Sequence, residues 1–453
     1  MMRPVIGADK DDLNYWSPWR RHYFLTLLCI VGIFNFIDRQ IVSILLEPIK
    51  TEFHASDTEM GLLTGLLFAG FYLVGALPAA RLAEYFPRKW VIALSLLAWS
   101  GCTTLGGFAR SFWQLATTRI GVALTEGGAL PISQSLITDL YPAASRARAF
   151  AILTSAHAIG VGISVFFGGW LSHNFGWRSS FFVVGAPGVL FGILIMLTIK
   201  EPPRGLSDRM ARRREEEIVA PAAAVEAQTP PPFLAALRIL WSLRSYRYLV
   251  LTTILAGVAA LGFLSWGPTF LMRVHGMTQV QVGGWFGVTV ASSLVLGALS
   301  GGFLGDRLGR NGVQGYRWML SAGPLLSIIP GLLFCFSATW QVAVAALFFW
   351  SLLLTTYQPV GTKIAQSLVP LRMRATAAVV LTFGTGVFGS GLAPVLVGAL
   401  NDLWEPTLGP EAIRYSLALV SVFAAAGAAT SFLAMRWVEA DYRSVHGVDY
   451  PVA

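Results

Sequence analysis

Charged residues are scarce in this chain. Asp, Glu, Lys and Arg make up only 13% of the 453 residues, whereas hydrophobic residues make up 55%. The mean hydropathy is +0.62, and soluble domains usually carry about 25% charged residues. Apolar tracts such as 25–37, 183–199 and 417–434 recur too closely to fill one soluble core. Because a lipid bilayer solvates such tracts, the composition predicts a membrane protein with many spans.

Sequence signals of an enzyme or a metal site are missing as well. Cys29, Cys102 and Cys335 lie in apolar tracts without disulfide, metal or redox spacing, so we expect them to be buried packing residues. The sequence has no Gly-x-Ser-x-Gly elbow, no His-Glu-x-x-His helix and no phosphate-cradling loop. We therefore expect no metal, no cofactor and no catalytic residue, and a membrane-embedded lipid enzyme or receptor is the weaker alternative to a carrier.

Basic residues outnumber acidic ones, with a formal net charge of +9. They fall in short clusters between apolar tracts, without the continuous basic face that a nucleic acid would need. If both termini are cytoplasmic, the cytoplasmic segments hold roughly 25 Lys and Arg and the outer loops about five. This asymmetry predicts cytoplasmic termini in the plasma (bacterial inner) membrane and no nucleic-acid partner. The outer basic residues would be Lys50, Arg110, Arg178, Arg273 and Arg414.

The apolar tracts, each of about 20 residues, predict about twelve transmembrane helices. The first tract contains Asp38 and Arg39 and lacks a small-residue cleavage site, so we interpret it as a retained span and not as a signal peptide. The predicted spans are 22–46, 58–80, 90–109, 112–138, 147–171, 180–199, 246–271, 280–304, 316–336, 341–366, 375–400 and 414–436.

A polar segment at 200–245 divides the spans into two sets of six. It contains a run of alternating charge blocks at 212–217 and a Pro and Ala stretch, which predict a cytoplasmic linker. The charge run is typical of a solvated helix face or a disordered tether. The expected division is an N-terminal segment at 1–21, a first bundle at 22–199, the linker at 200–245, a second bundle at 246–436 and a cytoplasmic tail at 437–453.

The two sets of spans repeat short sequences in register. Residues 80–89 lie 222 positions before 302–311, each expected in the loop after the second span of its half. Trp113 lies 227 positions before Trp340, each opening a fourth span. Several landmarks at a similar offset indicate an internal repeat, as in many membrane carriers.

At these residues the chain resembles the major facilitator superfamily. The family signature Gly-x-Leu-x-Asp-Arg-x-Gly-Arg-Arg is closely matched by 302–311, and 80–89 keeps its acid and a basic pair. The resemblance implies an all-α integral membrane fold of twelve transmembrane helices in two six-helix bundles. It also implies a latch, in which an acid at a helix end pairs with Arg or a helix N-terminus of the neighbouring bundle. The expected gating residues are Glu84, Arg88, Lys89, Asp306, Arg307 and Arg310.

The first half resembles more specifically the spinster group of lipid transporters. The resemblance is carried by 35–39 in span one, 119–129 in span four and the segment 141–149. That group is associated with movement of sphingosine-1-phosphate and lysophospholipids, so the resemblance implies a lysolipid-like substrate. In drug antiporters, span five ends with the signature Gly-Pro-x-x-Gly-Gly. This signature is only partly present at 164–169, which makes drug efflux a weaker interpretation.

Four ionisable residues lie within predicted spans of the first half. Such residues are costly in hydrocarbon unless they face water or a partner, so each is a functional hypothesis. Asp38 and Arg39 lie in span one, and Arg119 and Glu126 share one face of span four. We expect Asp38 to pair with Arg119, and Arg39 to point about 100° away. Asp38 and Glu126 are predicted to carry a coupling proton, and Arg39 and Arg119 to bind substrate. The alternative is a static structural ion pair.

Further site residues are expected outside this group. Lys363 near the inner end of span ten is predicted either to bind an anionic substrate group or to snorkel to the surface. His157 in span five is either a packing residue or a proton relay. In the second half, aromatic residues replace the charges, and we expect an apolar substrate wall from Phe349, Trp350 and Phe383.

Together with the resemblance, these features predict a proton-coupled secondary transporter that moves a lysolipid-like amphiphile by alternating access. The expected partners are membrane lipid, an amphiphilic small molecule and protons, and the expected state is a monomer. The alternative within transport is a carrier of organic anions, sugar acids or drugs.

Overall fold

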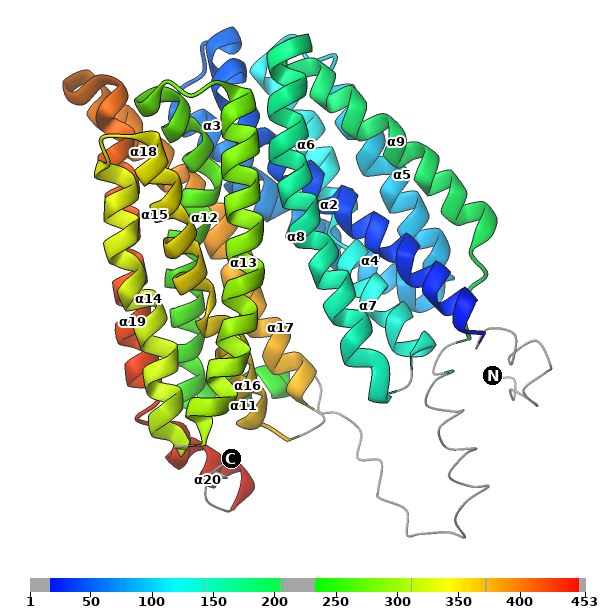
Figure 1. Ribbon diagram of the computed structural model, residues 1–453. Helices are drawn as coiled ribbons and strands as arrows, with labels where there is room; N and C mark the ends of the chain where they lie inside the picture. Colours follow the sequence, from blue (N-terminus) through cyan, green and yellow to red (C-terminus); the bar gives the residue numbers. More distant parts are fainter. Residues whose placement is uncertain are drawn as a thin grey trace. The chain divides into compact units, whose positions relative to one another are not determined.

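The computed structural model describes residues 17–141, 143–203, 206, 233–310, 312–370 and 373–447. Within these ranges the chain is built from helices and has no strand (Figure 1). The first part of the chain forms α2 (Pro18–Phe53), α3 (Asp57–Thr64), α4 (Leu66–Tyr85), α5 (Arg88–Gly106), α6 (Phe112–Glu126), α7 (Ala129–Leu140), α8 (Ala143–Phe175) and α9 (Trp177–Thr198). The second part forms α11 (Phe233–Ser242), α12 (Arg244–His275), α13 (Gln279–Gly309), α14 (Gly312–Phe336), α15 (Trp340–Thr355), α16 (Tyr357–Ser367), α17 (Arg374–Gly384), η2 (Thr385–Gly389), α18 (Ser390–Leu408), η3 (Gly409–Glu411), α19 (Ala412–Ala434) and α20 (Val438–His446).

Nine helical stretches among the described residues are long and apolar enough to cross a membrane. The last of them, 376–434, contains two predicted spans, whereas α5 and the α6–α7 pair are not among the nine. α6 and α7 have 15 and 12 residues, and a helix needs about 20 residues to cross the hydrocarbon. The fold is therefore a membrane-type helical one, and the number of twelve spans stays a prediction.

The helices extend beyond the apolar tracts that predicted them. α2 has 36 residues, which at a rise of about 1.5 Å per residue exceeds a hydrocarbon layer of about 30 Å. The tract at 22–46 therefore marks only the apolar middle of α2. The predicted linker and tail also differ from simple tethers, because their described parts include the short helices α11 and α20. The charge run at 212–217 lies outside the described residues.

Four predicted spans are interrupted and not single helices. The interruptions fall at Gly65 between α3 and α4, at Gly127 between α6 and α7, and at Thr356 between α15 and α16. The span at 375–400 contains the π-helical turn η2. Apolar composition cannot predict these breaks, because they depend on backbones that approach one another closely.

The repeat seen in the sequence recurs in how the helices pack. A Cβ atom on Gly75 of α4 would collide with the carbonyl oxygen of Leu124 in α6. At the matching place, a Cβ on Gly297 of α13 would lie 2.6 Å from the carbonyl oxygen of Leu352 in α15. In each half, a glycine on the second span lets this span contact the fourth span closely. The contacted residue of the fourth span lies just before the point where that span is interrupted.

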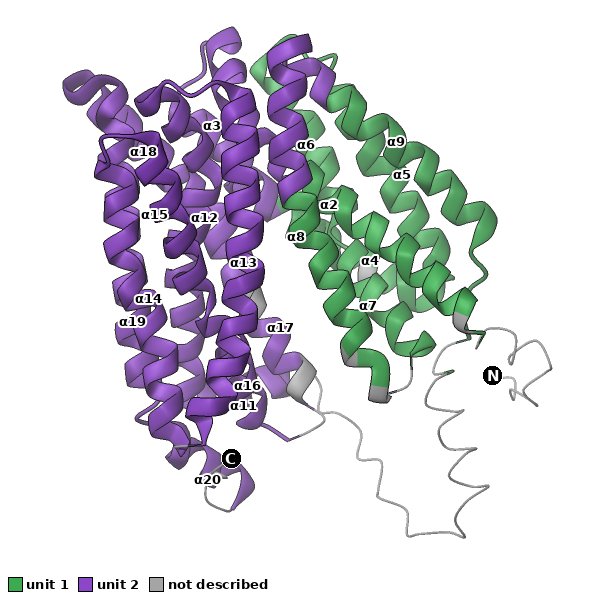
Figure 2. Ribbon diagram, in the orientation of Figure 1, with its two compact units in different colours: residues 1–38, 71–161, 181–227 green, residues 39–70, 162–180, 228–453 purple. Residues whose placement is uncertain are grey.

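The described residues form two compact units (Figure 2). Unit 1 comprises residues 1–38, 71–161 and 181–227, and unit 2 comprises residues 39–70, 162–180 and 228–453. The units do not follow the two sequence halves, because 39–70 and 162–180 of the first half are grouped with the second half. Within unit 2, for example, a Cβ on Gly65 would lie 2.5 Å from the carbonyl oxygen of Gly391 in α18.

Candidate functional site

Asp38 is a fully buried acid of unit 1. It lies on α2, is 0% exposed, and its Oδ1 accepts a hydrogen bond of 2.6 Å from the hydroxyl of Thr103 on α5. A carboxyl group that is fully removed from water needs such partners, because an unpaired charge in a low-dielectric interior is strongly disfavoured. Asp38 is therefore held by a neighbouring helix and cannot turn toward bulk water without rearrangement.

Arg119 of α6 lies beside Asp38. Its guanidinium Nη2 donates a 2.9 Å hydrogen bond to the main-chain carbonyl oxygen of Asp38, and the residue is only 3% exposed. The side chain of Ser111 caps the start of α6 by accepting from the Gln114 amide. Near the middle of this helix, a Cβ on Gly121 would lie 2.7 Å from Cys102 Sγ, so α5 and α6 pack closely. The two expected partners thus lie side by side, and this hydrogen bond joins the Arg119 guanidinium to the main chain of Asp38.

Glu126 is the last residue of α6 and is 0% exposed. Gly127 and Gly128 follow it, and added Cβ atoms there would collide with the Tyr72 carbonyl oxygen and the Ala79 side chain of α4. The two glycines therefore let α4 press against the point where α6 ends. Glu126 sits at a helix interruption, where the backbone has more ways to adjust than in a continuous helix.

Arg39 and His157 have other surroundings. The Arg39 guanidinium lies 5.5 Å from the Phe68 ring centroid, both residues belonging to unit 2. His157 of α8 stacks on Phe36 of α2 with ring centroids 4.5 Å apart, and an added Cβ on Gly32 would lie 2.9 Å from its ring. This close packing supports a structural role for His157, while its role as a relay stays a prediction.

Arg88, the first expected basic gating residue, is buried at the start of α5 with 4% exposure. Its Nη1 lies 2.5 Å from Asp139 Oδ2 near the end of α7, and its Nε lies 3.0 Å from Glu201 Oε1 beyond α9. Lys89 reaches the same place, because its amide donates to Glu201 Oε2 at 2.9 Å. These contacts tie three segments of unit 1 together at one end.

The other expected gating residues are more exposed. Glu84 pairs with Arg81 on the same helix at 2.5 Å, with side chains 59% and 66% exposed. In unit 2, Asp306 lies 3.0 Å from Lys363 Nζ, and Arg307 and Arg310 are exposed. The signature residues 80–85 and 302–309 belong to the last turns of α4 and α13, so the expectation that they lie in loops is wrong. The helices continue because nothing in these segments breaks the i to i−4 ladder before Pro87 and Gly309.

The three aromatic residues predicted to form a substrate wall differ in environment. Trp350 is 4% exposed and stacks on Phe263 of α12, with ring centroids 4.2 Å apart. Phe349 is 56% exposed. The side chain of Phe383 lies outside the described part of the chain. Trp350 thus packs inside unit 2, and a substrate-binding role for these residues stays a prediction.

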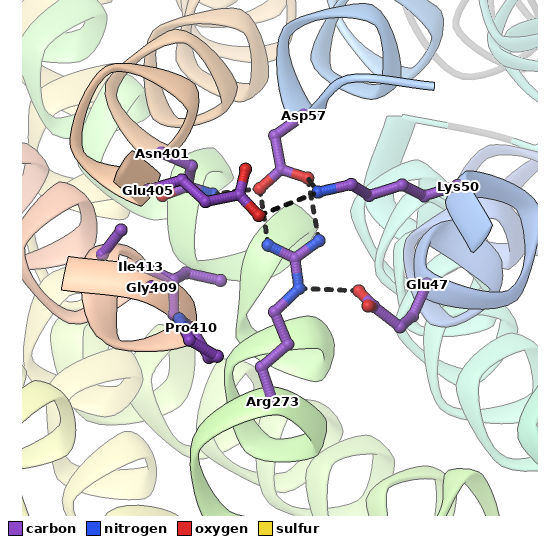
Figure 3. A pocket seen from close by; sticks show the side chains of 10 residues that line it. Glu47, Lys50, Asp57, Arg273, Asn401, Glu405, Gly409, Pro410 and Ile413 are labelled. Atoms are coloured by element: carbon purple, nitrogen blue, oxygen red, sulfur yellow. Dashed lines mark hydrogen bonds and ion pairs between the residues drawn. The ribbon is translucent and has the colours of Figure 1, made fainter. Parts of the chain in front are cut away.

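A second charged cluster was missed by sequence reasoning. Asp57, at the start of α3, is 0% exposed and contacts Arg273, Lys50 and Asn401 (Figure 3). We define the Asp57 cluster as Glu47, Lys50, Asp57, Arg273, Asn401 and Asp402. The charge asymmetry of the sequence identifies Lys50 and Arg273 only as basic residues of outer loops. The available signal was the capping sequence Ser56-x-x-Glu59, which predicts a helix start and places Asp57 in its first turn.

The described ranges contain no group of three His, Cys, Asp or Glu residues arranged to hold a metal ion. The buried charged residues of unit 1 described above come from neighbouring helices, namely Asp38 of α2, Arg88 of α5, Arg119 and Glu126 of α6, and Asp139 of α7. Such an arrangement can take up and release protons or hold a charged ligand.

Comparisons with known proteins agree with this architecture. The sequence model of the Major Facilitator Superfamily matches residues 28–314. An MFS-type efflux pump of Mycolicibacterium smegmatis is 30% identical over 439 residues, which cover 96% of this chain and 97% of the relative. Protein spinster homolog 1 of Homo sapiens is 27% identical over 457 residues, which cover 94% of this chain and 83% of the relative. A solved bacterial homologue of the human lysosomal transporter spinster, in an inward-facing and unoccupied conformation, has a TM-score of 0.83 and 27% identity, covering 96% of this chain and 100% of that one.

Proposed function

The chain belongs to the Major Facilitator Superfamily and resembles the spinster transporters, and from this membership we propose that it is a proton-coupled carrier of a lysolipid-like amphiphile. Membership makes the chain a multi-pass membrane transporter. The observation that carries the proton and substrate proposals is the set of buried charges in unit 1, with Asp38 and Glu126 at 0% exposure and Arg119 at 3%.

Asp38 and Glu126 are proposed to carry the coupling proton. A buried carboxyl group stays ionised while a cation or water is near and takes up a proton when these move away. Asp38 already lies beside Arg119, and Glu126 ends the same helix that carries Arg119. A movement of α6 relative to α2 would therefore alter the surroundings of both acids. Protonation and conformation would then be linked, as proton-driven transport requires.

Arg119 and Arg39 are proposed to attract the anionic head group of the substrate. A guanidinium has five fixed donors that suit phosphate and carboxylate. The spinster resemblance favours a substrate with one acyl or alkyl chain, and aromatic residues of the second half, including Phe349, would contact that chain. Lys363 would be a further site for the head group if its contact with Asp306 opens.

Counterflow into proteoliposomes tests the substrate proposal. Labelled lysophospholipid should exchange unchanged. Its binding free energy should become less favourable by about 0.8 kcal/mol for each methylene removed from its acyl chain. Arg119→Gln should weaken the exchange, whereas Arg110→Gln, at an exposed site before α6, should not. Equal affinity for lysolipids and tail-less head groups would contradict an amphiphilic substrate, and conversion to a product would contradict a carrier.

A carrier of drugs, organic anions or sugar acids is the second candidate. It is favoured by the 30% identity to the mycobacterial efflux pump over nearly the whole chain. A thermal-shift screen separates the candidates, because a ligand that binds only the folded state raises its apparent stability. Stabilisation by cationic drugs or sugar acids, but not by lysolipids, would favour this second function.

The same proposal includes location and orientation. The charge asymmetry supports insertion into the bacterial inner membrane with both termini and residues 200–245 on the cytoplasmic side. In this orientation Asp57, which follows α2 by a short connection, lies at the outer side together with its cluster.

A further inference from the structure

Three arginines lie against aromatic rings at one end of unit 2. The guanidinium carbons of Arg317, in the second turn of α14, and of Arg436, just after α19, lie 5.2 and 5.7 Å from the ring centroid of Phe432. The guanidinium carbon of Arg244, the first residue of α12, lies 4.4 Å from the ring centroid of Trp437. We define the arginine strip as these five residues. It brings together one end of each of three helices within the same unit.

The arginines of the strip lack acidic partners. None of the three forms an ion pair with a described residue. By contrast, Arg178, Arg273 and Arg414 also lie against rings, and each of them pairs with an acid. The buried Nε of Arg317 donates no hydrogen bond to a described atom. Because a contact with an aromatic face does not use the N–H donors of a guanidinium, the donors of the strip are available to an anion.

The acids that follow the strip in the sequence do not neutralise it. Asp441 of α20 accepts hydrogen bonds from the Ser245 amide and hydroxyl at 2.7 and 2.6 Å, so its carboxylate caps the start of α12. Glu439 is exposed and forms no ion pair with a described residue. Positive charges that lie close together repel one another. An anion bound at the strip would therefore be attracted by several arginines at once.

The strip borders a helix surface that is suited to lipid. α14 and α19 lie side by side (Figure 1), and the hydroxyls of Ser321 and Ser431 join them at 2.9 Å, one turn after Arg317. Trp318, the next residue after Arg317, is exposed. The same face of α14 carries further exposed apolar side chains, namely Leu325, Ile329 and Phe336. Arg and Trp at the end of such an apolar face are typical of the level of the lipid head groups.

We propose that the arginine strip binds the phosphate of an anionic phospholipid, whose acyl chains lie along the exposed face of α14. The guanidinium groups donate to the phosphate, and the aromatic rings hold the guanidinium groups in place. In the proposed orientation the strip faces the cytoplasmic leaflet, because α14 begins just after the second signature segment at 302–311. The site is separate from the residues proposed to bind the transported substrate. The bound lipid holds the ends of α12, α14 and α19 together.

Lipid titration followed by native mass spectrometry tests the site on the detergent-solubilised full-length carrier. Phosphatidylglycerol should bind more tightly than phosphatidylcholine with the same chains, because only its head group carries a net negative charge. Arg317→Gln with Arg436→Gln should weaken binding of the first phosphatidylglycerol about tenfold, since two charge-assisted contacts are lost. Binding of phosphatidylcholine should not change. Arg436→Gln alone, at an exposed position, should act in the same direction and serves if the double variant folds poorly.

Arg238→Gln with Arg247→Gln is the matched control. It removes two exposed positive charges from α11 and the first turn of α12, but neither arginine lies against an aromatic ring of a described residue. Its affinity for phosphatidylglycerol should equal that of the unmutated carrier. An equal loss in the control, or unchanged affinity in both strip variants, would overturn the proposal.

A competition experiment separates a lipid from a soluble anion. Glycerophosphoglycerol, which is the head group without acyl chains, should not displace phosphatidylglycerol at equal concentration, because it gains nothing from the apolar face of α14. Equal competition would show a site for soluble anions and would contradict a lipid site. Because the measurements need no transported molecule, a wrong transport function would leave their outcome intact.

Discussion

At the scale of single residues, similar side chains in one short segment have very different environments. Arg81 and Arg88 both belong to the first signature region, yet the Arg81 side chain is 66% exposed and that of Arg88 only 5%. Arg81 pairs along its own helix, whereas Arg88 joins α5 to Asp139 and Glu201. Only the buried arginine can hold separate segments in place.

The two arginines should therefore differ in their effect on stability. Arg88→Ala should lower the free energy of unfolding by about 3–5 kcal/mol, because the contacts of a buried base with Asp139 and Glu201 are lost. Arg81→Ala should cost about 0–1 kcal/mol, since it removes an exposed pair. Unfolding in mild detergent, followed by tryptophan fluorescence, measures both. Equal losses for the two variants would show that Arg88 is not the structural tie inferred from its contacts.

The proposed proton carriers make another prediction at this scale. Asp38→Asn and Glu126→Gln should each abolish proton-driven accumulation, because neither amide titrates. If the two acids share one task, the double variant should be no worse than either single one. Transport rates of all three variants in proteoliposomes measure this coupling. Additive losses would mean that the acids act in separate steps.

At the scale of helices, the sequence predicts where apolar segments lie better than where helices break. Each predicted span falls on helical segments, four of them interrupted, because a backbone in hydrocarbon must satisfy its own hydrogen bonds. The interruption after Glu126 depends on contacts between Gly127 and α4, which no single tract reveals.

For the buried charges, the sequence predicts that Asp38 and Arg119 lie in the same region, but it does not predict the Asp57 cluster. Arg273 and Asp57 are 216 residues apart in the sequence, and only the folded chain brings them together.

Close contacts between helices give a prediction for α13. Gly297→Ala should destabilise the carrier by about 1–3 kcal/mol, because its Cβ would press on the Leu352 carbonyl oxygen at 2.6 Å. Gly302→Ala in the same helix is the control, since a Cβ there meets no described atom within 4 Å. The control should be neutral or more stable by up to about 1 kcal/mol, as alanine favours helix. A tolerated Gly297→Ala would contradict the inferred close packing of α13 and α15.

At the scale of the whole molecule, the orientation can be tested by labelling. Native cysteines are first replaced, and one new cysteine is placed either at Glu216 in the linker segment or at Arg110 between α5 and α6. An impermeant reagent added to intact cells should label Arg110→Cys and leave Glu216→Cys unlabelled, because basic segments stay in the cytoplasm. Labelling of Glu216→Cys from outside would reverse the proposed orientation and move the Asp57 cluster to the inner side.

The most direct test of the account is lysolipid accumulation in proteoliposomes under an imposed pH gradient. The unmutated carrier should move substrate against its own gradient at the expense of the proton gradient. Glu126→Gln should lose this accumulation and retain exchange down a substrate gradient, because the amide keeps the shape of the protonated acid without titrating. Full gradient-driven accumulation by Glu126→Gln would contradict the account and make Glu126 a structural residue.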